Sequence, residues 1–139
     1  MPLQNEKMSM SNSNLFYREN LLDHSRNPRN YGPMPDFTRK AEVVNRHCGD
    51  SLVLYIKEKN GKIAEAKFEG SGCFVSISSA SMIVETLVGK DLSVLNKIKK
   101  KDILKNFGRD LTPSRQQCAL LVYQALEEII NGRFNKEEV

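Results

Sequence analysis

The spacing of apolar residues changes twice along the chain, from a helical period to a strand-like period and back. Apolar residues at helical spacing predict a first helix from Asn14 to Asn27, because Pro28 disfavours helical backbone in the residue before it. Residues 1–13 carry no such pattern and are expected to be disordered. The turn-forming residues that follow the helix, up to Pro35, predict an ordered but irregular connection.

Three β-rich runs follow, at residues 41–46, 51–59 and 62–69. Asn60-Gly61 separates the last two runs and is a strong signal for a tight β-hairpin. Strict alternation in the third run predicts a strand with one packed face and one partly wet face. The sequence therefore predicts a three-stranded antiparallel sheet with helices over its packed face.

The helical period returns after the third strand. A densely apolar stretch with small side chains predicts a buried helix over Phe74–Val88, with Gly89 as its stop. A short helix is expected over Asp91–Ile98, and a last helix over residues 114–131 with Ser114 as its N-cap. Strands followed by helices predict an α+β sandwich.

Composition and charge narrow the class of protein. The chain has 139 residues, 40% hydrophobic and 27% charged, which is typical of one soluble globular domain. We expect this domain over residues 14–132 and a C-terminal tail over 133–139. The net charge of +4 is spread along the chain, which disfavours a nucleic-acid partner. No apolar run reaches the roughly 18–20 residues that span a bilayer, and the polar N-terminus lacks a secretory signal, so we expect a cytoplasmic protein without a membrane partner.

Three cysteines are an odd number, which excludes a fully paired disulfide framework within one chain and favours free thiols or metal ligands. The predicted elements place Cys48 in the turn between the first two strands and Cys73 where the third strand ends. Cys118 is expected in the first turn of the last helix. Thiols in loops and at helix N-termini have lowered pKa values, and the thiolate is the form that binds soft metals.

Asp50 adds a carboxylate to the same loop as Cys48. Three thiolates and one carboxylate suit a tetrahedral Zn²⁺ site, or iron held mainly by sulfur with one weaker oxygen ligand. An exchangeable oxygen ligand would let such a site open. Gly49 and Gly72 flank two of the cysteines, which favours a close backbone approach or a positive φ. Because the chain has no C-x-x-C pair, three unrelated reduced cysteines remain an alternative.

Several short motifs occur in a specific order along the chain. They are Asn27-Pro28-Arg29-Asn30, Cys48-Gly49-Asp50, Gly70-Ser71-Gly72-Cys73, Ser78-Ser79-Ala80-Ser81, Gly89-Lys90 and the run from Leu111 to Cys118. On these motifs the chain resembles the IscU/SufU/NifU family of iron–sulfur cluster assembly scaffolds, over roughly residues 14–132.

The resemblance implies a scaffold rather than an enzyme. Such a scaffold accepts sulfur from a cysteine desulfurase, assembles a transient [2Fe-2S] cluster and transfers it to apo-proteins. The resemblance also implies that Cys48, Cys73 and Cys118 hold the cluster or a metal, and that Asp50 is the labile ligand. Cys118 or Cys48 is implied as the acceptor of the persulfide sulfur.

Two departures from the family pattern concern its branches. IscU-type proteins have a histidine where this chain has Gln117. They also have a segment that an Hsp70-type chaperone recognises, which residues 111–115 do not reproduce. The resemblance therefore does not extend to binding of that chaperone. Arg115, three residues before Cys118, matches the SufU pattern, although the SufU insertion before this cysteine is missing. A zinc-dependent sulfurtransferase that activates the desulfurase is therefore an alternative, and a small structural zinc protein with a basic interaction surface is a third.

Residues outside this set admit two interpretations each. His47 is an alternative metal ligand, because it lies in the same loop as Cys48. A catalytic pair with Cys48 is disfavoured, because neighbours on an extended chain point apart. His24 is expected to be exposed or to pack at the N-terminus. The lysines of 97–101 are expected at a solvated helix C-terminus or in docking of an acidic partner. Arg115 would hold a thiolate or a persulfide, or form a salt bridge.

Overall fold

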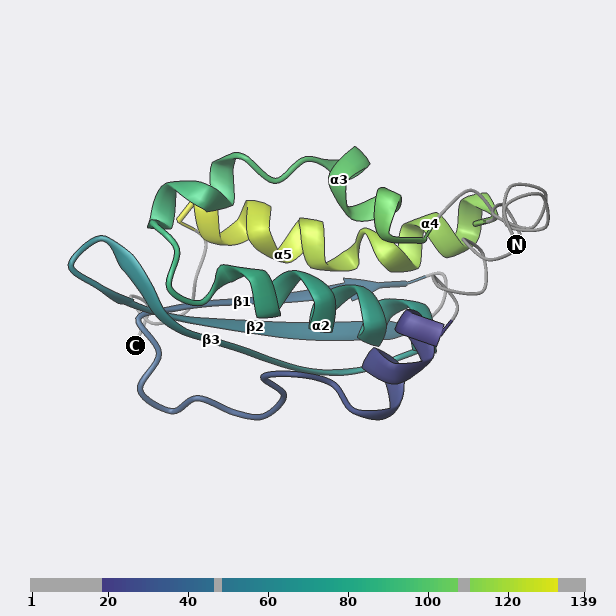
Figure 1. Ribbon diagram of the computed structural model, residues 1–139, viewed down its shortest axis with the longest axis horizontal. Helices are drawn as coiled ribbons and strands as arrows, with labels where there is room; N and C mark the ends of the chain where they lie inside the picture. Colours follow the sequence, from purple (N-terminus) through teal and green to yellow (C-terminus); the bar gives the residue numbers. More distant parts are fainter. Residues whose placement is uncertain (1–18, 47–48, 108–110, 133–139) are drawn as a thin grey trace, which may run out of the picture.

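The computed structural model describes residues 19–46, 49–107 and 111–132. They form one β-sheet with helices packed over one of its faces (Figure 1). The strands are β1 (Arg39–Asn45), β2 (Asp50–Lys59) and β3 (Lys62–Ser71). They pair antiparallel in the order β1-β2-β3. The predicted sheet is confirmed, with each strand extended by one or two residues at an end.

One face of the sheet is packed, but the strict alternation predicted for the third strand is wrong at its start. The pairing of β2 with β3 has a register shift between Lys57 and Glu58, so Ile63 is buried like Ala66 although the two are three residues apart. In β3, Ile63, Ala66 and Phe68 are fully buried, while the residues between them are exposed or half-buried. The hairpin between β2 and β3 turns at Asn60 and Gly61, both of which have positive φ. This backbone is the one that a two-residue hairpin with a matching twist requires.

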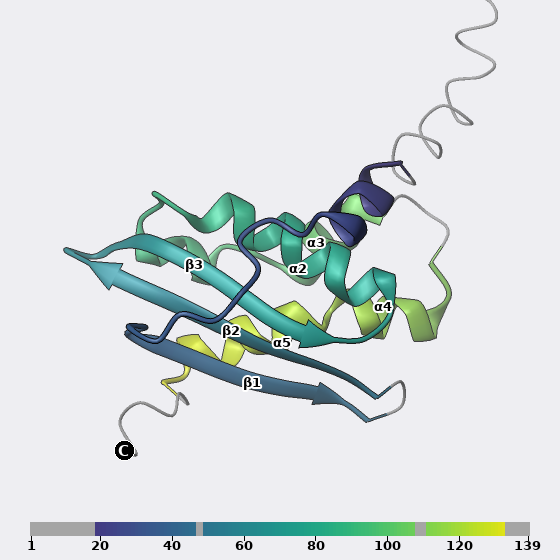
Figure 2. The same ribbon diagram turned by 90° about the horizontal axis from the view of Figure 1, so that it is seen from below.

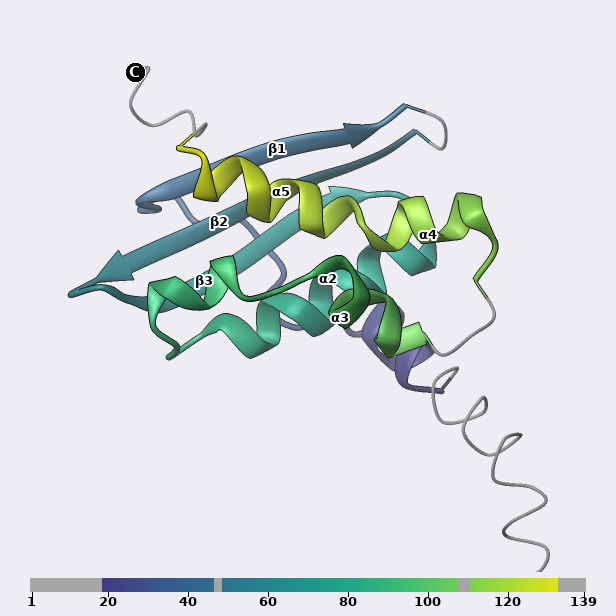
Figure 3. The same cartoon turned by 90° about the horizontal axis from the view of Figure 1, so that it is seen from above.

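The helices cover the packed face. They are α2 (Phe74–Leu87), η1 (Leu92–Asn96), α3 (Lys100–Leu104), η2 (Lys105–Phe107), α4 (Pro113–Ala119) and α5 (Leu121–Ile130), besides a helical segment at residues 19–26. α2 lies over β3, and α5 lies over β1 and β2 (Figure 3). The α+β architecture is thus as predicted. Within the described ranges, none of these helices combines the length and the apolarity needed to cross a membrane.

Buried apolar side chains form two clusters of unequal size. The larger lies between the sheet, α2 and α5, and includes Leu54, Ile56, Ile63, Val84 and Leu126. The smaller cluster lies at the end of the molecule where α2 begins, and consists of Leu21, Val75, Met82, Phe107, Cys118 and Ala119. Cys118 is therefore part of a packed apolar wall.

The predicted helix over residues 114–131 is wrong in its continuity. It is interrupted at Leu120, whose φ of −90° and ψ of 4° separate α4 from α5. The hydroxyl of Ser79 in α2 donates to the carbonyl of Ala119 at 2.7 Å, at the break. The predicted cap is also wrong, because Thr112 is the N-cap of α4 and its side chain accepts from the backbone N–H of Arg115. Ser114 is the second residue of the helix.

The lysine-rich segment differs from the expectation as well. The predicted helix over Asp91–Ile98 is a short 3-10 helix, η1, capped by the Asp91 side chain. Lys97 is the C-cap of η1, as expected. Lys99 is instead the N-cap of α3, and Lys100 and Lys101 open it, so these three lysines lie at a helix N-terminus. All three are exposed, as expected of solvated side chains.

The segment 19–26 is attached to α2 by apolar packing of Leu21 against Val75 and Met82 and by hydrogen bonds. Ser78 donates to the carbonyl of Leu21 at 2.6 Å. His24 is buried, not exposed, with Nδ1 2.7 Å from the Ser81 hydroxyl and Nε2 3.8 Å from Glu85. The predicted packing role is the one that the structure bears out. The serines of α2 do allow close packing, but they also bind neighbouring elements.

The connection after this segment pairs over a short stretch with the outer edge of β3. Residues 30–32 run beside β3, where the backbone N–H of Gly32 donates to the carbonyl of Phe68 at 2.9 Å (Figure 2). The backbone N–H of Phe68 in turn donates to the carbonyl of Asn30 at 3.0 Å. The expected irregular connection is thus ordered by main-chain pairing.

Candidate metal centre

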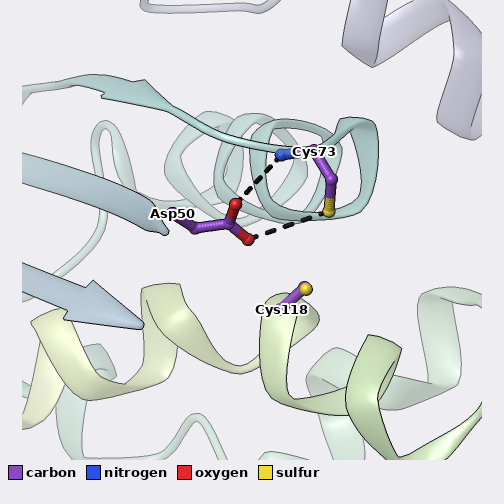
Figure 4. Close-up of side chains that lie close together, drawn as sticks. All are labelled: Asp50, Cys73 and Cys118. Atoms are coloured by element: carbon purple, nitrogen blue, oxygen red, sulfur yellow. Dashed lines mark hydrogen bonds between the residues drawn. The ribbon is translucent and has the colours of Figure 1, made fainter. Parts of the chain in front are cut away.

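Three side chains with metal-binding atoms converge from three elements (Figure 4). Asp50 is the first residue of β2, Cys73 is the N-cap of α2, and Cys118 lies in α4. One ligand atom from each, a carboxylate oxygen and two sulfurs, lies within 4.8 Å of the others. Residues far apart in the sequence therefore form one compact donor group at the end of the sheet.

Two glycines make this approach possible. A Cβ at Gly72 would lie 2.6 Å from Oδ1 and 2.7 Å from Cγ of Asp50, so a side chain at position 72 would displace the carboxylate. Gly49 has a φ of +73°, a conformation that L side chains rarely adopt. Of the two expected reasons for a glycine, a close approach applies at Gly72 and a positive φ applies at Gly49.

The Asp50 carboxylate is buried, with 2% of the residue exposed, and both of its oxygens have hydrogen-bond donors. Oδ1 accepts from the backbone N–H of Cys73 at 3.2 Å. Oδ2 accepts from the hydroxyl of Ser76 at 2.5 Å and lies 3.8 Å from the Cys73 sulfur, whose thiol donates to it. A buried carboxylate without such donors would be strongly destabilising.

The Cys73 thiol is placed to ionise. Burial raises its pKa, but hydrogen bonds from the backbone N–H and the hydroxyl of Ser76, from Cys118 and from the backbone N–H of Val75 outweigh burial, so the pKa of Cys73 is lowered from its ordinary value. The first turn of a helix supplies such donors because its N–H groups have no partner within the helix. The position of Cys73 therefore favours the thiolate that a metal binds.

A pocket of about 570 Å³ opens over the three side chains. Its lining comprises Gly49, Asp50, Ser71, Gly72, Cys73, Ser114, Arg115 and Cys118. Arg115 is the basic residue in this lining, and its guanidinium carbon lies 5.5 Å from the ring centre of Phe74. This stacking holds a positive charge at the pocket beside two thiols and a carboxylate.

The donor set fits a metal centre. Two sulfurs and one carboxylate oxygen are ligands that Zn²⁺ accepts in tetrahedral sites, and thiolates are the main ligands of iron–sulfur clusters. The lowered pKa of Cys73 favours its thiolate form, and the pocket gives access from solvent. Cys73, Cys118 and Asp50 could hold such a group.

The sequence-predicted residues do not all fall in the described part of the chain. Asp50, Cys73 and Cys118 are brought together, whereas Cys48 and His47 lie outside the described residues. Gly49, which follows Cys48 in the sequence, lines the pocket.

Cys118 is not in the first turn of a long helix, as expected, but near the C-terminal end of the short helix α4. The N–H groups at a helix N-terminus, which lower the pKa of a thiol, therefore lie beside Cys73 and not beside Cys118. Gln117, the residue before Cys118, is exposed and is not part of the pocket lining. The described contact of Arg115 is with Phe74 rather than with a thiolate or a carboxylate.

Sequence reasoning missed Ser76, which is 3% exposed and contacts both Asp50 and Cys73. The signal for it was its spacing. A serine three residues after an N-cap residue lies in the first turn of the helix, where its hydroxyl faces the same end as the orphan N–H groups. The cysteine at position 73 and the serine at position 76 have this spacing.

The fold and the site together define a class of small α+β proteins that gather cysteine thiols and a carboxylate at one end of a three-stranded sheet. The sequence model of the family described as NifU-like N-terminal domain matches residues 16–138. The chain therefore belongs to the NifU-like N-terminal domain family, as the resemblance predicted.

Named relatives include both expected branches. The chain is 33% identical to the iron–sulfur cluster assembly scaffold protein IscU 1 of Archaeoglobus fulgidus, over 87% of this chain and 78% of the relative. It is also 33% identical to the zinc-dependent sulfurtransferase SufU of Bacillus subtilis, over 85% of this chain and 91% of the relative.

Among solved structures, a SufU protein of Fervidobacterium islandicum superposes with a TM-score of 0.69 at 25% identity. The match covers 81% of this chain and 94% of that one. The N-terminal NifU-like protein of Brucella abortus has a TM-score of 0.68 at 19% identity, over 83% of this chain and 92% of that one, which shows a shared fold.

Proposed function

We propose that this chain is a cytoplasmic scaffold on which an iron–sulfur cluster is assembled and from which it is transferred to apo-proteins. The observation that carries the proposal is the convergence of Asp50, Cys73 and Cys118, with ligand atoms within 4.8 Å of one another beside an open pocket. Relatives named as scaffold proteins support it. In this proposal Cys48 is the third thiolate ligand, and the cargo is a [2Fe-2S] cluster.

Sulfur would arrive from a cysteine desulfurase that carries it as a cysteine persulfide. A thiolate of the scaffold attacks the outer sulfur of that persulfide, a new S–S bond forms, and the thiolate of the desulfurase leaves. Cys118 or Cys48 is the acceptor. Arg115 supports the anionic product because its guanidinium lines the same pocket as Cys118.

A mixed set of ligands suits a cargo that must leave. Thiolates bind iron and zinc strongly, whereas a single carboxylate oxygen is a harder and weaker partner for an iron–sulfur cluster. Each oxygen of the Asp50 carboxylate has a hydrogen-bond donor in the protein itself, so a ligand exchange at Asp50 would not leave a bare charge. Asp50 is therefore the ligand at which the site would open.

The test is anaerobic incubation of the protein with a cysteine desulfurase, ferrous iron and cysteine, followed by addition of an apo-ferredoxin. Visible absorbance of a [2Fe-2S] cluster that appears on this chain and then moves to the ferredoxin is the expected result. Cys73→Ser is the matched loss-of-site variant. Absence of any cluster on the chain, with the desulfurase active, would contradict the scaffold proposal.

The second candidate is a zinc-dependent sulfurtransferase that activates the desulfurase without carrying a cluster. The similarity to the Bacillus subtilis SufU and the Arg115-x-x-Cys118 arrangement at the pocket favour it. The same experiment separates the two proposals. Faster desulfurase turnover with zinc retained and no cluster formed would favour the sulfurtransferase.

A further inference from the structure

The start of α2 is stabilised by a carboxylate from another element. Cys73, its N-cap residue, makes no side-chain capping bond, and the first turn contains no acidic residue. Asp50, from β2, accepts from the Cys73 backbone N–H and from the Ser76 hydroxyl instead. A negative charge at a helix N-terminus is favourable, so the Asp50 carboxylate stabilises the start of α2.

Ser76 binds the particular oxygen that faces the sulfur. Its hydroxyl donates to Oδ2 of Asp50 at 2.5 Å, and the same oxygen lies 3.8 Å from the Cys73 sulfur. Ser76 is 3% exposed, so water does not compete for this bond. A metal held by Cys73 and Asp50 would compete with the Ser76 hydroxyl for the carboxylate.

We propose that Ser76 is a positioning residue that holds the Asp50 carboxylate in the metal-free state and thereby speeds release of a bound metal or cluster. When the Asp50 carboxylate leaves the metal, it regains the hydrogen bond from the Ser76 hydroxyl in place of its bond to the metal. The inference rests on the proposed function in one respect, because it takes Asp50 as a ligand. The role of Ser76 itself comes from the contacts above.

The chain offers a matched control on the same helix. Ser78 is also fully buried, and its hydroxyl donates to the carbonyl of Leu21, away from Asp50. Ser78→Ala removes a buried serine hydroxyl from α2 without touching the carboxylate. Ser76→Thr keeps the hydroxyl at position 76.

The experiment measures the rate at which a chelator removes Zn²⁺ from the full chain and from these variants. A buried hydrogen bond to a charged group is worth enough to change a rate on the order of tenfold. We expect Ser76→Ala to release zinc about tenfold more slowly than the unchanged protein, and Ser76→Thr and Ser78→Ala to release it at nearly the original rate. In an Asp50→Ala background, Ser76→Ala should have no effect on release.

A structural role alone would not give this pattern. Ser76→Ala should also lower the free energy of unfolding of the metal-free protein more than that of the zinc-loaded protein, because only the metal-free carboxylate needs the hydroxyl. Zinc release from Ser76→Ala at the original rate or faster would overturn the inference. A further slowing by Ser76→Ala in the Asp50→Ala background, relative to Asp50→Ala alone, would also overturn it. If the unchanged protein binds no zinc and no cluster, the proposed function fails as well, which is a different outcome.

A measurement on the unchanged protein covers the case in which Ser76→Ala does not fold. By proton NMR, the Ser76 hydroxyl is expected to exchange slowly with solvent in the metal-free protein and faster after zinc is added. Equal protection in both states would show that Asp50 does not leave Ser76, which contradicts the proposal.

Discussion

The two ends of the sheet differ in what satisfies their polar groups. At the hairpin end, backbone bonds join β3 and the hairpin to the segment after α2: the N–H of Ile63 donates to the carbonyl of Lys90 at 2.8 Å, and the N–H of Leu92 donates to the carbonyl of Gly61 at 2.9 Å. At the opposite end, the N–H of Cys73 and the hydroxyl of Ser76 both donate to the Asp50 side chain. The link between the sheet and the helical side is thus made by backbone groups at the hairpin end and by a carboxylate at the start of α2.

The difference between backbone and carboxylate partners bears on which end of the sheet would bind the proposed metal. A backbone bond cannot be given up without opening the fold, whereas a carboxylate can exchange one partner for another while the strand and the helix stay in place. In the proposed function, the hairpin end supplies stability and the pocket end supplies the exchangeable ligands. The predictions below test this division, from the largest expected effect to the smallest.

Truncation in the large cluster should damage stability and spare the site. Ile63 is fully buried in that cluster, so Ile63→Ala should lower the free energy of unfolding by about 2–5 kcal/mol. Urea unfolding measures the loss. Zinc affinity of the folded fraction should not change, and a parallel loss of zinc affinity would contradict the division between the two ends.

Loss of a thiol at the pocket should lower zinc affinity and spare the stability of the fold. Cys118→Ser should leave the protein folded but reduce zinc affinity by more than about 100-fold, because replacing a ligand costs more than the 10–100-fold typical of residues behind the ligands. Competition with a chelator measures the affinity, and circular dichroism checks the fold. Full zinc occupancy in Cys118→Ser would remove Cys118 from the site.

Two glycine substitutions compare the ends directly. In Gly72→Ala the new methyl group would lie 2.6 Å from Oδ1 of Asp50, so we expect a loss of about 1–3 kcal/mol in stability together with weaker zinc binding. In Gly61→Ala there is open space, but the φ of +78° is strained for alanine, at about 1–2 kcal/mol. Gly61→Ala should therefore lose stability and keep its zinc affinity. Equal zinc affinity in both variants would argue against the close packing at Gly72.

Removal of the carboxylate should change kinetics more than affinity. Asp50→Ala should slow cluster transfer to an apo-ferredoxin by about tenfold and leave a longer-lived coloured protein, since the exchangeable oxygen ligand is gone. Stopped-flow absorbance follows the transfer, with Asp91→Ala as a control for loss of an exposed carboxylate elsewhere. Unchanged transfer kinetics would exclude Asp50 as the labile ligand.

The smallest effect concerns the attachment of residues 19–26 to α2. Burial and the nearby Arg29 lower the pKa of His24 from 6.5, against the smaller opposing influence of Glu85 and Asp23. The unfolded chain therefore binds a proton at His24 more readily than the folded chain does. The stability of the fold that depends on neutral His24 is fully present above about pH 6.5, and it is lost as the pH falls toward the lower folded pKa.

His24→Gln should flatten this part of the pH dependence. Thermal unfolding on either side of about pH 6.5 measures it for the unchanged protein and for the variant. An identical pH dependence in both proteins would show that His24 does not couple protonation to this contact.

Local patterns predicted the regular elements and not the contacts between them. Alternation and Asn60-Gly61 located the hairpin, and small apolar residues located α2, within one or two residues. The break at Leu120 has no local signal, because the residues around it all tolerate a helix. It coincides with the hydrogen bond from Ser79 to Ala119, which joins positions far apart in the sequence.

The site shows the same limit. The chemical character of Asp50, Cys73 and Cys118 singled them out, but only the packing of β2, α2 and α4 brings them together. Ser76 was hidden among the serines of α2, because its role depends on which of them faces a carboxylate from another strand. Element type follows from local sequence, whereas partner choice follows from the tertiary arrangement.

The central claim is that the pocket end of this protein binds a metal through cysteine sulfur and the Asp50 carboxylate. X-ray absorption spectroscopy of the zinc-loaded full chain tests it most directly, because Zn–S distances of about 2.3 Å and Zn–O distances of about 2.0 Å are well separated. We predict three sulfur ligands and one oxygen ligand, with the oxygen contribution altered in Asp50→Ala and one sulfur lost in Cys73→Ser. A zinc ion surrounded by nitrogen and oxygen alone, or a spectrum that neither substitution changes, would contradict the account.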